Sequence, residues 1–150
     1  MPRLSLDSQF GHLTVSEDKG AIVALQWGGR AKGQPSPALL EARRQLLEYF
    51  AGKRRQFDLP LALDGTPTEL RVWQLMAEIP YGQTRSYGAL GQALGLAPRA
   101  VGRACGANKL PIIIPCHRVI GSGGRLGGYS GGEGAETKRR LLQLEHALLL

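Results

Sequence analysis

The chain has 150 residues, 43% of them hydrophobic, and a formal net charge of +7 at pH 7. This length suits one domain or two small ones, and the hydrophobic fraction excludes a chain that is disordered by composition. Two cysteines are too few for a disulfide framework, and no apolar run approaches the roughly 20 residues that span a membrane. No signal-peptide pattern is present, so we expect a cytoplasmic protein with both thiols reduced. We also expect a monomer.

The positive charge lies mainly in the second half of the chain. Residues 1–66 contain nine basic and seven acidic side chains, whereas residues 67–150 contain ten and five. No acidic residue lies between Glu78 and Glu133, and the same stretch contains six basic ones: Arg85, Arg99, Arg103, Lys109, Arg118 and Arg125. A segment with only positive charge predicts that this half of the chain meets a phosphate backbone.

The first half predicts a small α+β domain, residues 1–66. Residues 11–27 alternate apolar and polar around a turn at 18–20, which is typical of a β-hairpin. Ser36 and Pro37 predict the start of a helix that runs to about Phe50 and ends before Gly52. A short strand is expected near residues 57–63. The basic residues at 43–44 and 53–55 are interpreted as a solvated face.

The second half, residues 67–150, predicts a mostly helical domain on which the first domain packs. Thr66 or Thr68 can cap a helix over residues 69–79. Two short helices over 87–94 and 99–107 then flank a tight turn at 95–98, which is a helix-turn-helix pattern. Such pairs also occur in proteins that touch no DNA, but beside the basic stretch the pattern favours DNA binding.

The second of these helices carries small residues, Ala100, Gly102 and Ala104. A recognition helix that reads bases in the major groove needs long polar side chains. Small residues instead allow close approach to a surface such as the minor groove, which carries little sequence code. Close helix packing in the core explains small residues equally well.

A thiol and an imidazole stand side by side at Cys116 and His117, after the apolar run 112–114 and Pro115. This pattern predicts a nucleophile at the end of a buried, extended segment, because neighbouring His and Arg side chains favour the thiolate. Adjacent residues of an extended chain point to opposite sides, so His117 needs a turn or a water to reach the sulfur. From these two residues alone, a buried structural cysteine remains the alternative.

The string from Asn108 to Ile120, NKLPIIIPCHRVI, resembles the active-site signature of the O6-alkylguanine-DNA alkyltransferases. Ser86-Tyr87 and the block 98–102 are similar to further parts of that family's pattern, and the likeness runs from about Trp73 to Glu145. It implies direct-reversal DNA repair: after base flipping, the alkyl group of O6-alkylguanine, or of O4-alkylthymine, moves once and irreversibly to Cys116. It implies double-stranded DNA as the partner, with no cofactor and no metal.

The resemblance also assigns roles to residues. Cys116 is the nucleophile, His117 takes its proton through a water, and Glu145 orients His117 in a triad-like arrangement. Asn108 ties the Cys segment to the second helix, and Tyr87 helps to rotate the nucleotide. The expected DNA contacts in the minor groove are Arg99, which inserts into the base stack, and Ala100, Gly102, Tyr87 and Ser122.

Residues 121–134 contain eight glycines, which by themselves predict a flexible surface loop. The resemblance places the guanine pocket here, with the pocket residues Pro111, Val119, Tyr129, Ser130 and Lys138. The Tyr129 hydroxyl can supply a proton as the guanine leaves. A damage-binding protein without transfer, a Cys-His hydrolase, a metal site and a transcription factor are the alternatives. Cys116 argues against a binding protein without transfer, and no oxyanion hole can be placed for a hydrolase. The cysteines and histidines lack metal-ligand spacing, and the small residues of the second helix argue against a transcription factor.

Overall fold

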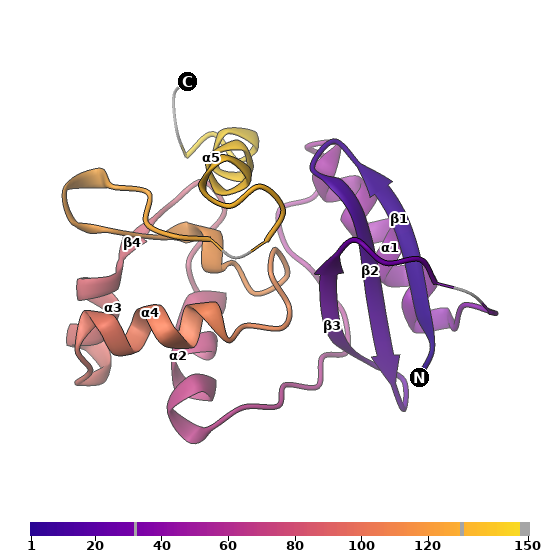
Figure 1. Cartoon of the computed structure of the whole chain (residues 1–150), viewed down its shortest axis with the longest axis horizontal. Coiled ribbons are helices and arrows are strands. Elements are labelled where there is room, and N and C mark those ends of the chain that lie inside the picture. Colours follow the sequence, from indigo (N-terminus) through magenta and orange to yellow (C-terminus); the bar gives the residue numbers. More distant parts are fainter. Residues whose placement is uncertain (32, 130, 148–150) are drawn as a thin grey trace. The chain divides into compact units, whose positions relative to one another are not determined.

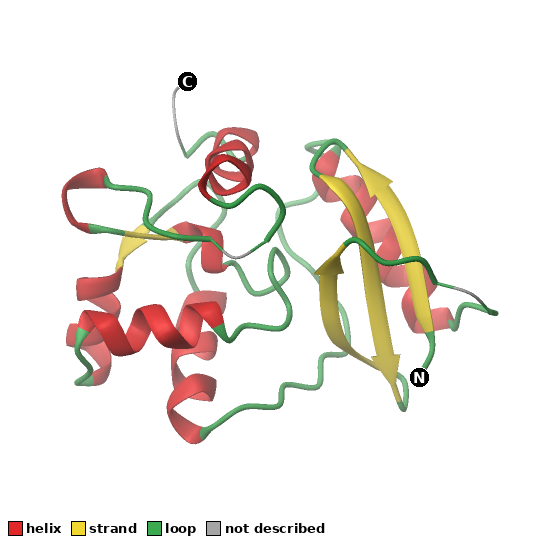
Figure 2. Ribbon diagram, viewed as in Figure 1, coloured by secondary structure: helices red, strands yellow, loops and turns green. Residues whose placement is uncertain are grey.

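The computed structural model describes residues 1–31, 33–129 and 131–147. The chain divides into two compact units, Met1–Asp64 and Gly65–Leu150. The first is a sheet with one helix and the second is mostly helical, which confirms the α+β class (Figure 1). Figure 2 shows the same division by secondary structure. Within the described part of the chain, no helix is long and apolar enough to cross a membrane.

The sheet of the first unit has three antiparallel strands in the order β1-β2-β3: β1 (Arg3–Ser8), β2 (Gly11–Asp18) and β3 (Ala21–Trp27). The predicted β2-β3 hairpin is confirmed, with its turn at Lys19 and Gly20, both of positive φ. β1 was not predicted, although its Leu4 and Leu6 alternate with polar neighbours. Leu13 and Val15 on β2 are fully buried and form part of the core.

Helix α1 (Pro37–Phe50) packs against all three strands. It begins as predicted, because the Ser36 hydroxyl accepts a hydrogen bond from the Leu39 amide at 3.2 Å. The prediction of a strand at residues 57–63 is wrong, since these described residues make a single β-bridge, between Leu61 and Ile22. Pro60 lies in the middle of this stretch and has no amide hydrogen to donate, which limits further pairing.

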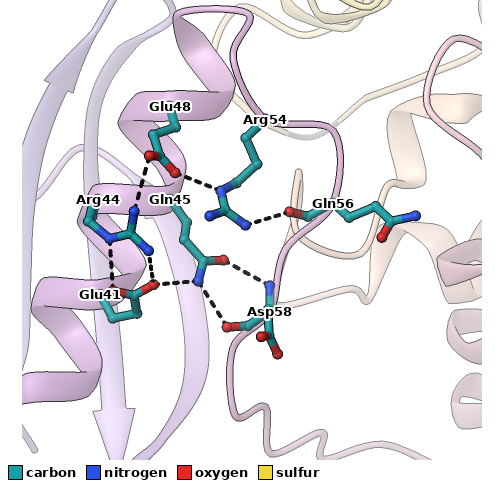
Figure 3. Close-up of polar contacts among 7 residues, drawn as sticks. All are labelled: Glu41, Arg44, Gln45, Glu48, Arg54, Gln56 and Asp58. Atoms are coloured by element: carbon teal, nitrogen blue, oxygen red, sulfur yellow. Dashed lines mark hydrogen bonds and ion pairs between the residues drawn. The ribbon is translucent and has the colours of Figure 1, made fainter.

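A polar network holds Arg44 of α1 and Arg54, which follows the helix (Figure 3). Arg44 contacts Glu41 at 2.6 Å and Glu48 at 3.1 Å, and Arg54 contacts Glu48 at 2.8 Å. Arg44 and Arg54, two of the basic residues interpreted as a solvated face, are therefore paired with carboxylates of α1. Buried Gln45 fastens the following loop, since its amide exchanges two hydrogen bonds with the Asp58 backbone.

Helix α2 (Pro67–Ala77) opens the second unit and starts two residues earlier than predicted. Thr66 caps it and Glu69 bonds back to the Thr66 amide, which completes a capping box. Its buried Trp73 donates a hydrogen bond to the Ala104 carbonyl at 2.7 Å. This bond joins α2 to α4 (Pro98–Gly106), the helix that carries the predicted DNA contacts.

The helix-turn-helix is present as α3 (Tyr87–Leu94) followed by α4. Ser86 caps α3 by accepting the Ala89 amide at 2.9 Å. Gly95 ends α3 in the left-handed conformation, φ 70°, where an L-residue would be strained. In front of α3, the short strand β4 (Arg85–Ser86) pairs in parallel with β5 (Val119–Ile120). This pairing, absent from the sequence analysis, fixes the start of α3 beside the Cys116 segment.

Gly91 makes the tight turn between α3 and α4 possible. A Cβ at this position would overlap the backbone oxygen of Leu96. We expect Gly91→Ala to lower the free energy of unfolding by about 1–3 kcal/mol, because backbone atoms would have to move. Gly88→Ala is the matched control in the same helix, since its Cβ would meet nothing closer than the Ser86 hydroxyl at 3.9 Å. Urea unfolding compares the two, and equal losses of stability would contradict the packing argument.

Helix α5 (Ala135–Leu144) ends before residues 145–147, which the prediction included; residues 148–149, the end of the predicted helix, lie outside the described residues. It stops because His146 adopts a left-handed conformation, φ 60°, which leaves Glu145 as the C-cap. The Ala147 amide then bonds back to the Leu142 carbonyl at 2.9 Å. This ending turns the Glu145 side chain into the protein, where it is 1% exposed.

Candidate active site

Cys116 does not lie at the end of an extended strand, as we expected, but in a tight turn. Ile112 has a positive φ of 74°, and the Ile114 amide bonds back to the Leu110 carbonyl at 2.8 Å. The 3₁₀-helix η1 (Cys116–Arg118) follows directly. Pro111 lies half-buried in the first of these turns. A left-handed isoleucine has no sequence signal, because β-branched residues rarely adopt this conformation.

The Cys116 thiol lies on the wall of a cavity of about 470 Å³, a size typical of small-molecule pockets. Among the described residues, seven line it: Tyr87, Gly102, Cys105, Gly106, Cys116, Gly128 and Tyr129. The structure thus brings together the predicted nucleophile, two predicted pocket or nucleotide residues and one face of α4. Gly102 and Gly106 are one turn apart on α4, and neither has an atom within 4 Å of the position of an added Cβ.

His117 and Glu145 meet as predicted, although 28 residues separate them. The His117 Nε2 atom is 2.7 Å from Glu145 Oε2, and both side chains are fully buried. With Nε2 donating to the carboxylate, Nδ1 is the nitrogen that can accept a proton. This Nδ1 atom is buried and has no hydrogen-bond partner among the described residues. The pair therefore has the arrangement of a base and its orienting carboxylate.

Arg118 completes this group, and the sequence analysis missed its role. Its guanidinium contacts both carboxylate oxygens of Glu145, at 2.8 and 2.9 Å, and donates to the Ile79 carbonyl at 2.7 Å. Burial would raise the pKa of Glu145, but the hydrogen bonds and charges of His117 and Arg118 outweigh burial and lower it to about 2. Burial lowers the pKa of His117, against the influence of Glu145, so the imidazole is held neutral and able to accept a proton.

The prediction that Arg118 helps to meet a phosphate backbone is wrong. Its side chain is buried, whereas the other five basic residues of the acid-free stretch are exposed: Arg85, Arg99, Arg103, Lys109 and Arg125. Arg118 directly follows the Cys-His pair and looks like any other basic residue in sequence. No local pattern could have assigned it to Glu145, because the two are 27 residues apart.

Asn108 fastens the Cys116 segment, as the resemblance implied. Its side-chain amide donates to the Ile114 carbonyl at 2.8 Å and its oxygen accepts the Leu110 amide at 3.0 Å. Burial raises the pKa of the Cys116 thiol, while a hydrogen bond from Asn108 and the charge of Lys138 act to lower it. The resting thiol therefore needs a base before it becomes a nucleophile.

Cys105, on α4, lines the same cavity but lacks these supports. Its thiol is 3.3 Å from the Met76 sulfur, and burial raises its pKa to about 12. Burial likewise raises the pKa of Tyr87 to about 12 and that of Tyr129 well above its usual value. Both phenols are thus neutral groups that can donate hydrogen bonds into the cavity.

The predicted pocket residues do not all reach the cavity wall. Lys138 is fully buried behind it, and Val119 is buried with its carbonyl 2.6 Å from the Lys138 ammonium. Pro111 is not among the lining residues. Ser130 lies outside the described residues. Lys138 contacts the lining residues Tyr87 and Gly128, and the resemblance gave no sign of its burial.

Apart from Tyr87 on α3, the predicted DNA contacts lie on α4 and on the glycine-rich segment. Arg99, in the first turn of α4, is exposed, and Ala100 is half-buried. Ala104 was expected on the same small-residue face, but it is 3% exposed and belongs to the core. Residues two apart on a helix point in different directions, so the three small residues cannot share one face. Ser122 is exposed in the short 3₁₀-helix η2 (Ser122–Gly124).

In the described part of the chain, no cluster of three or more His, Cys, Asp or Glu side chains could hold a metal ion. Near Cys116 in the chain, His117 contacts Glu145, and the second cysteine, Cys105, contacts Met76.

The fold and the site define a helix-turn-helix protein in which a buried thiol is followed by a buried imidazole that contacts a carboxylate. Models of one family match nearly the whole chain. The model described as "6-O-methylguanine DNA methyltransferase, DNA binding domain" matches residues 67–147. The "ribonuclease-like domain" of the same family matches residues 3–63. The chain belongs to the 6-O-methylguanine DNA methyltransferase family, as the signature around Cys116 indicated.

Relatives of known name agree with this assignment. The constitutive methylated-DNA–protein-cysteine methyltransferase of Bacillus subtilis is 41% identical and covers 93% of this chain and 92% of its own. The methylated-DNA–protein-cysteine methyltransferase of Mycobacterium tuberculosis is 43% identical, with coverages of 94% and 90%. A crystal structure of Mycobacterium tuberculosis OGT in complex with DNA superposes with a TM-score of 0.87, at 42% identity, over 98% of this chain and 94% of that one.

Proposed function

We propose that this protein repairs alkylated DNA by direct reversal, moving the alkyl group of O6-alkylguanine to its own Cys116. One observation carries the proposal: Cys116 lines a cavity, and the next residue, His117, is buried in contact with the Glu145 carboxylate. The protein acts as a methylated-DNA–protein-cysteine methyltransferase, each molecule once. O4-alkylthymine is a second substrate of the same chemistry.

The reaction is a single displacement at the alkyl carbon. His117 takes the thiol proton, through a bridging water, and the thiolate forms a bond to the alkyl carbon while the carbon–O6 bond breaks. The electron pair of that bond goes to the guanine, which accepts a proton from the Tyr129 hydroxyl. The proton that His117 took from the thiol then passes to Tyr129 and restores its hydroxyl. In the net reaction, the thiol proton therefore replaces the alkyl group on the guanine. The thioether formed on Cys116 is stable, because the thiolate would have to leave from it for the alkyl group to move on, and the protein is therefore consumed.

The helix-turn-helix presents the damaged strand to the cavity. A buried thiol cannot reach O6 inside a duplex, so the nucleotide has to leave the base stack. Exposed Arg99 takes the place of the flipped nucleotide in the base stack, and Tyr87 at the cavity wall turns the phosphate of that nucleotide. Helix α4 lies in the minor groove. Ser122 and Ala100 contact the backbone, and the protein binds double-stranded DNA as a monomer. The exposed basic residues supply non-specific affinity.

Intact-protein mass spectrometry tests the proposal directly. After incubation with excess duplex that contains one O6-methylguanine, the protein should gain the mass of one methyl group on the Cys116 peptide and no more. Undamaged duplex should add no mass. Binding without any gain would favour a damage-binding protein that performs no transfer. Methyl on another residue would overturn the assignment of the nucleophile.

Arg99→Ala should separate flipping from chemistry. We expect transfer from duplex O6-methylguanine to slow by roughly 10-fold or more, because a flipped base without a substitute in the stack costs a few kcal/mol. Transfer from the free base O6-methylguanine should change little. Arg103→Ala, another exposed arginine on α4, controls for the loss of one positive charge. Equal slowing on both substrates would rule out the role of Arg99 in flipping.

A further inference from the structure

Lys138 is a buried cation whose charge is not balanced by a carboxylate. Three ionised side chains are buried in the second unit: Arg118, Lys138 and Glu145. Arg118 and Glu145 neutralise each other through two short contacts. Among the described residues, no carboxylate pairs with Lys138, and its contacts are to neutral oxygens of Val119, Tyr87 and Gly128. A charge in this position is costly unless an anion lies nearby.

The position of Lys138 points to the anion that it serves. Its ammonium is 2.6 Å from the carbonyl oxygen of Val119, and Val119 directly follows the Cys116–Arg118 turn. It is also 3.3 Å from the Tyr87 hydroxyl and 3.3 Å from the Gly128 carbonyl. Tyr87 and Gly128 line the cavity together with Cys116. The ammonium therefore lies directly behind the wall that carries the nucleophile.

We propose that Lys138 is the counter-charge of the ionised Cys116 and holds the thiolate ready for attack, as a positioning residue behind the cavity wall. This inference rests on the proposed function of Cys116 and adds an electrostatic partner to its base. The buried charges sum to +1 while Cys116 is a thiol and to zero once it is a thiolate. Three acceptor oxygens match the three donors of an ammonium group, which keeps Lys138 in place without neutralising it.

The other titratable groups around the thiol do not substitute for Lys138. Burial raises the pKa of Cys105 and of Tyr87 to about 12 and that of Tyr129 well above its usual value, and none of these three groups can carry a positive charge. His117 is held neutral by burial, and Glu145 is ionised but paired with Arg118. Burial raises the pKa of Cys116, whereas the hydrogen bond of Asn108, the charge of Lys138 and a backbone hydrogen bond of Cys116 itself lower it, and Lys138 is the only cation among these influences.

The test measures the ionisation of Cys116 without DNA. In a Cys105→Ala background only one thiol remains, and its rate of alkylation by iodoacetamide, in which sulfur displaces iodide, follows the thiolate fraction against pH. Lys138→Met should move the midpoint upward by about one pH unit or more, the shift expected from loss of a nearby opposite charge. Lys138→Arg should restore most of the shift. Arg139→Met, which removes an exposed cation from the same helix, should leave the midpoint unchanged.

A midpoint in Lys138→Met equal to that in Arg139→Met would overturn the inference. Because Lys138→Met could also unfold the protein, a second measurement keeps Lys138 in place. Coupling between two sites is reciprocal. Cys116→Ser should therefore lower the pKa of Lys138 by the same amount by which Lys138 lowers the pKa of Cys116. NMR of the Lys138 side chain measures this pKa. An unchanged Lys138 pKa would also overturn it. Neither readout involves methyl transfer, so failure of the proposed function is seen separately.

Discussion

Cys116→Ala is expected to abolish alkyl transfer while leaving the affinity for duplex DNA unchanged. Cys116 as a whole is only 8% exposed, so it adds little to any contact with phosphates. The sulfur is the only group in the reaction that forms the new bond, and neither His117 nor Glu145 can replace it. Intact-protein mass after exposure to O6-methylguanine duplex measures transfer, and fluorescence anisotropy of the same duplex measures binding.

Cys105→Ala is the matched control, because Cys105 is the second thiol of the same cavity. It should still gain one methyl group, since its hydrogen-bonded neighbour is the Met76 sulfur and no base supports it. A methylated Cys116→Ala variant would mean that Cys105 can act as the acceptor. The two single variants together therefore assign the transfer to one sulfur, which a mass gain in the parent protein cannot do without peptide mapping.

Local patterns were sufficient for the elements that present the site. The caps at Ser36 and Ser86 and the turn at Gly95 mark three boundaries, because capping and left-handed turns depend on the identity of single residues. The His117–Glu145 contact was also predicted, but through the resemblance to a family. Periodicity and spacing alone favoured an exposed carboxylate at Glu145.

The missed features all depend on contacts between distant segments. β4 and β5 contain two residues each and exist only because they pair across more than 30 residues of chain. Arg118 and Lys138 are buried against groups from other elements, and a basic residue ordinarily predicts a solvated surface. The left-handed Ile112 contradicts the preference of its own side chain. Tertiary packing overrides local propensity at these positions, and they all surround Cys116.

Glu145→Gln is expected to weaken both the fold and the reaction. The change leaves Arg118 buried without its anion, and removal of one partner from a buried ion pair costs about 3–5 kcal/mol. It also removes the carboxylate that fixes the His117 tautomer, so transfer by the folded fraction should slow by roughly 10²–10⁴-fold. Urea unfolding and single-turnover transfer kinetics measure the two effects. Glu136→Gln, which breaks an exposed pair with Arg139, should alter neither.

The pH dependence of stability separates the charge of Glu145 from its shape. Its pKa in the folded protein is about 2, below the ordinary value of 4.5, so the folded state favours the ionised form. The resulting stability is fully present above about pH 4.5 and is lost as the pH falls toward 2, because the unfolded chain then binds the proton first. Glu145→Gln cannot bind that proton, so the difference in stability between parent and variant should shrink across this window. A difference that stays constant down to pH 2 would show that packing, and not the ion pair with Arg118, holds this corner of the site together.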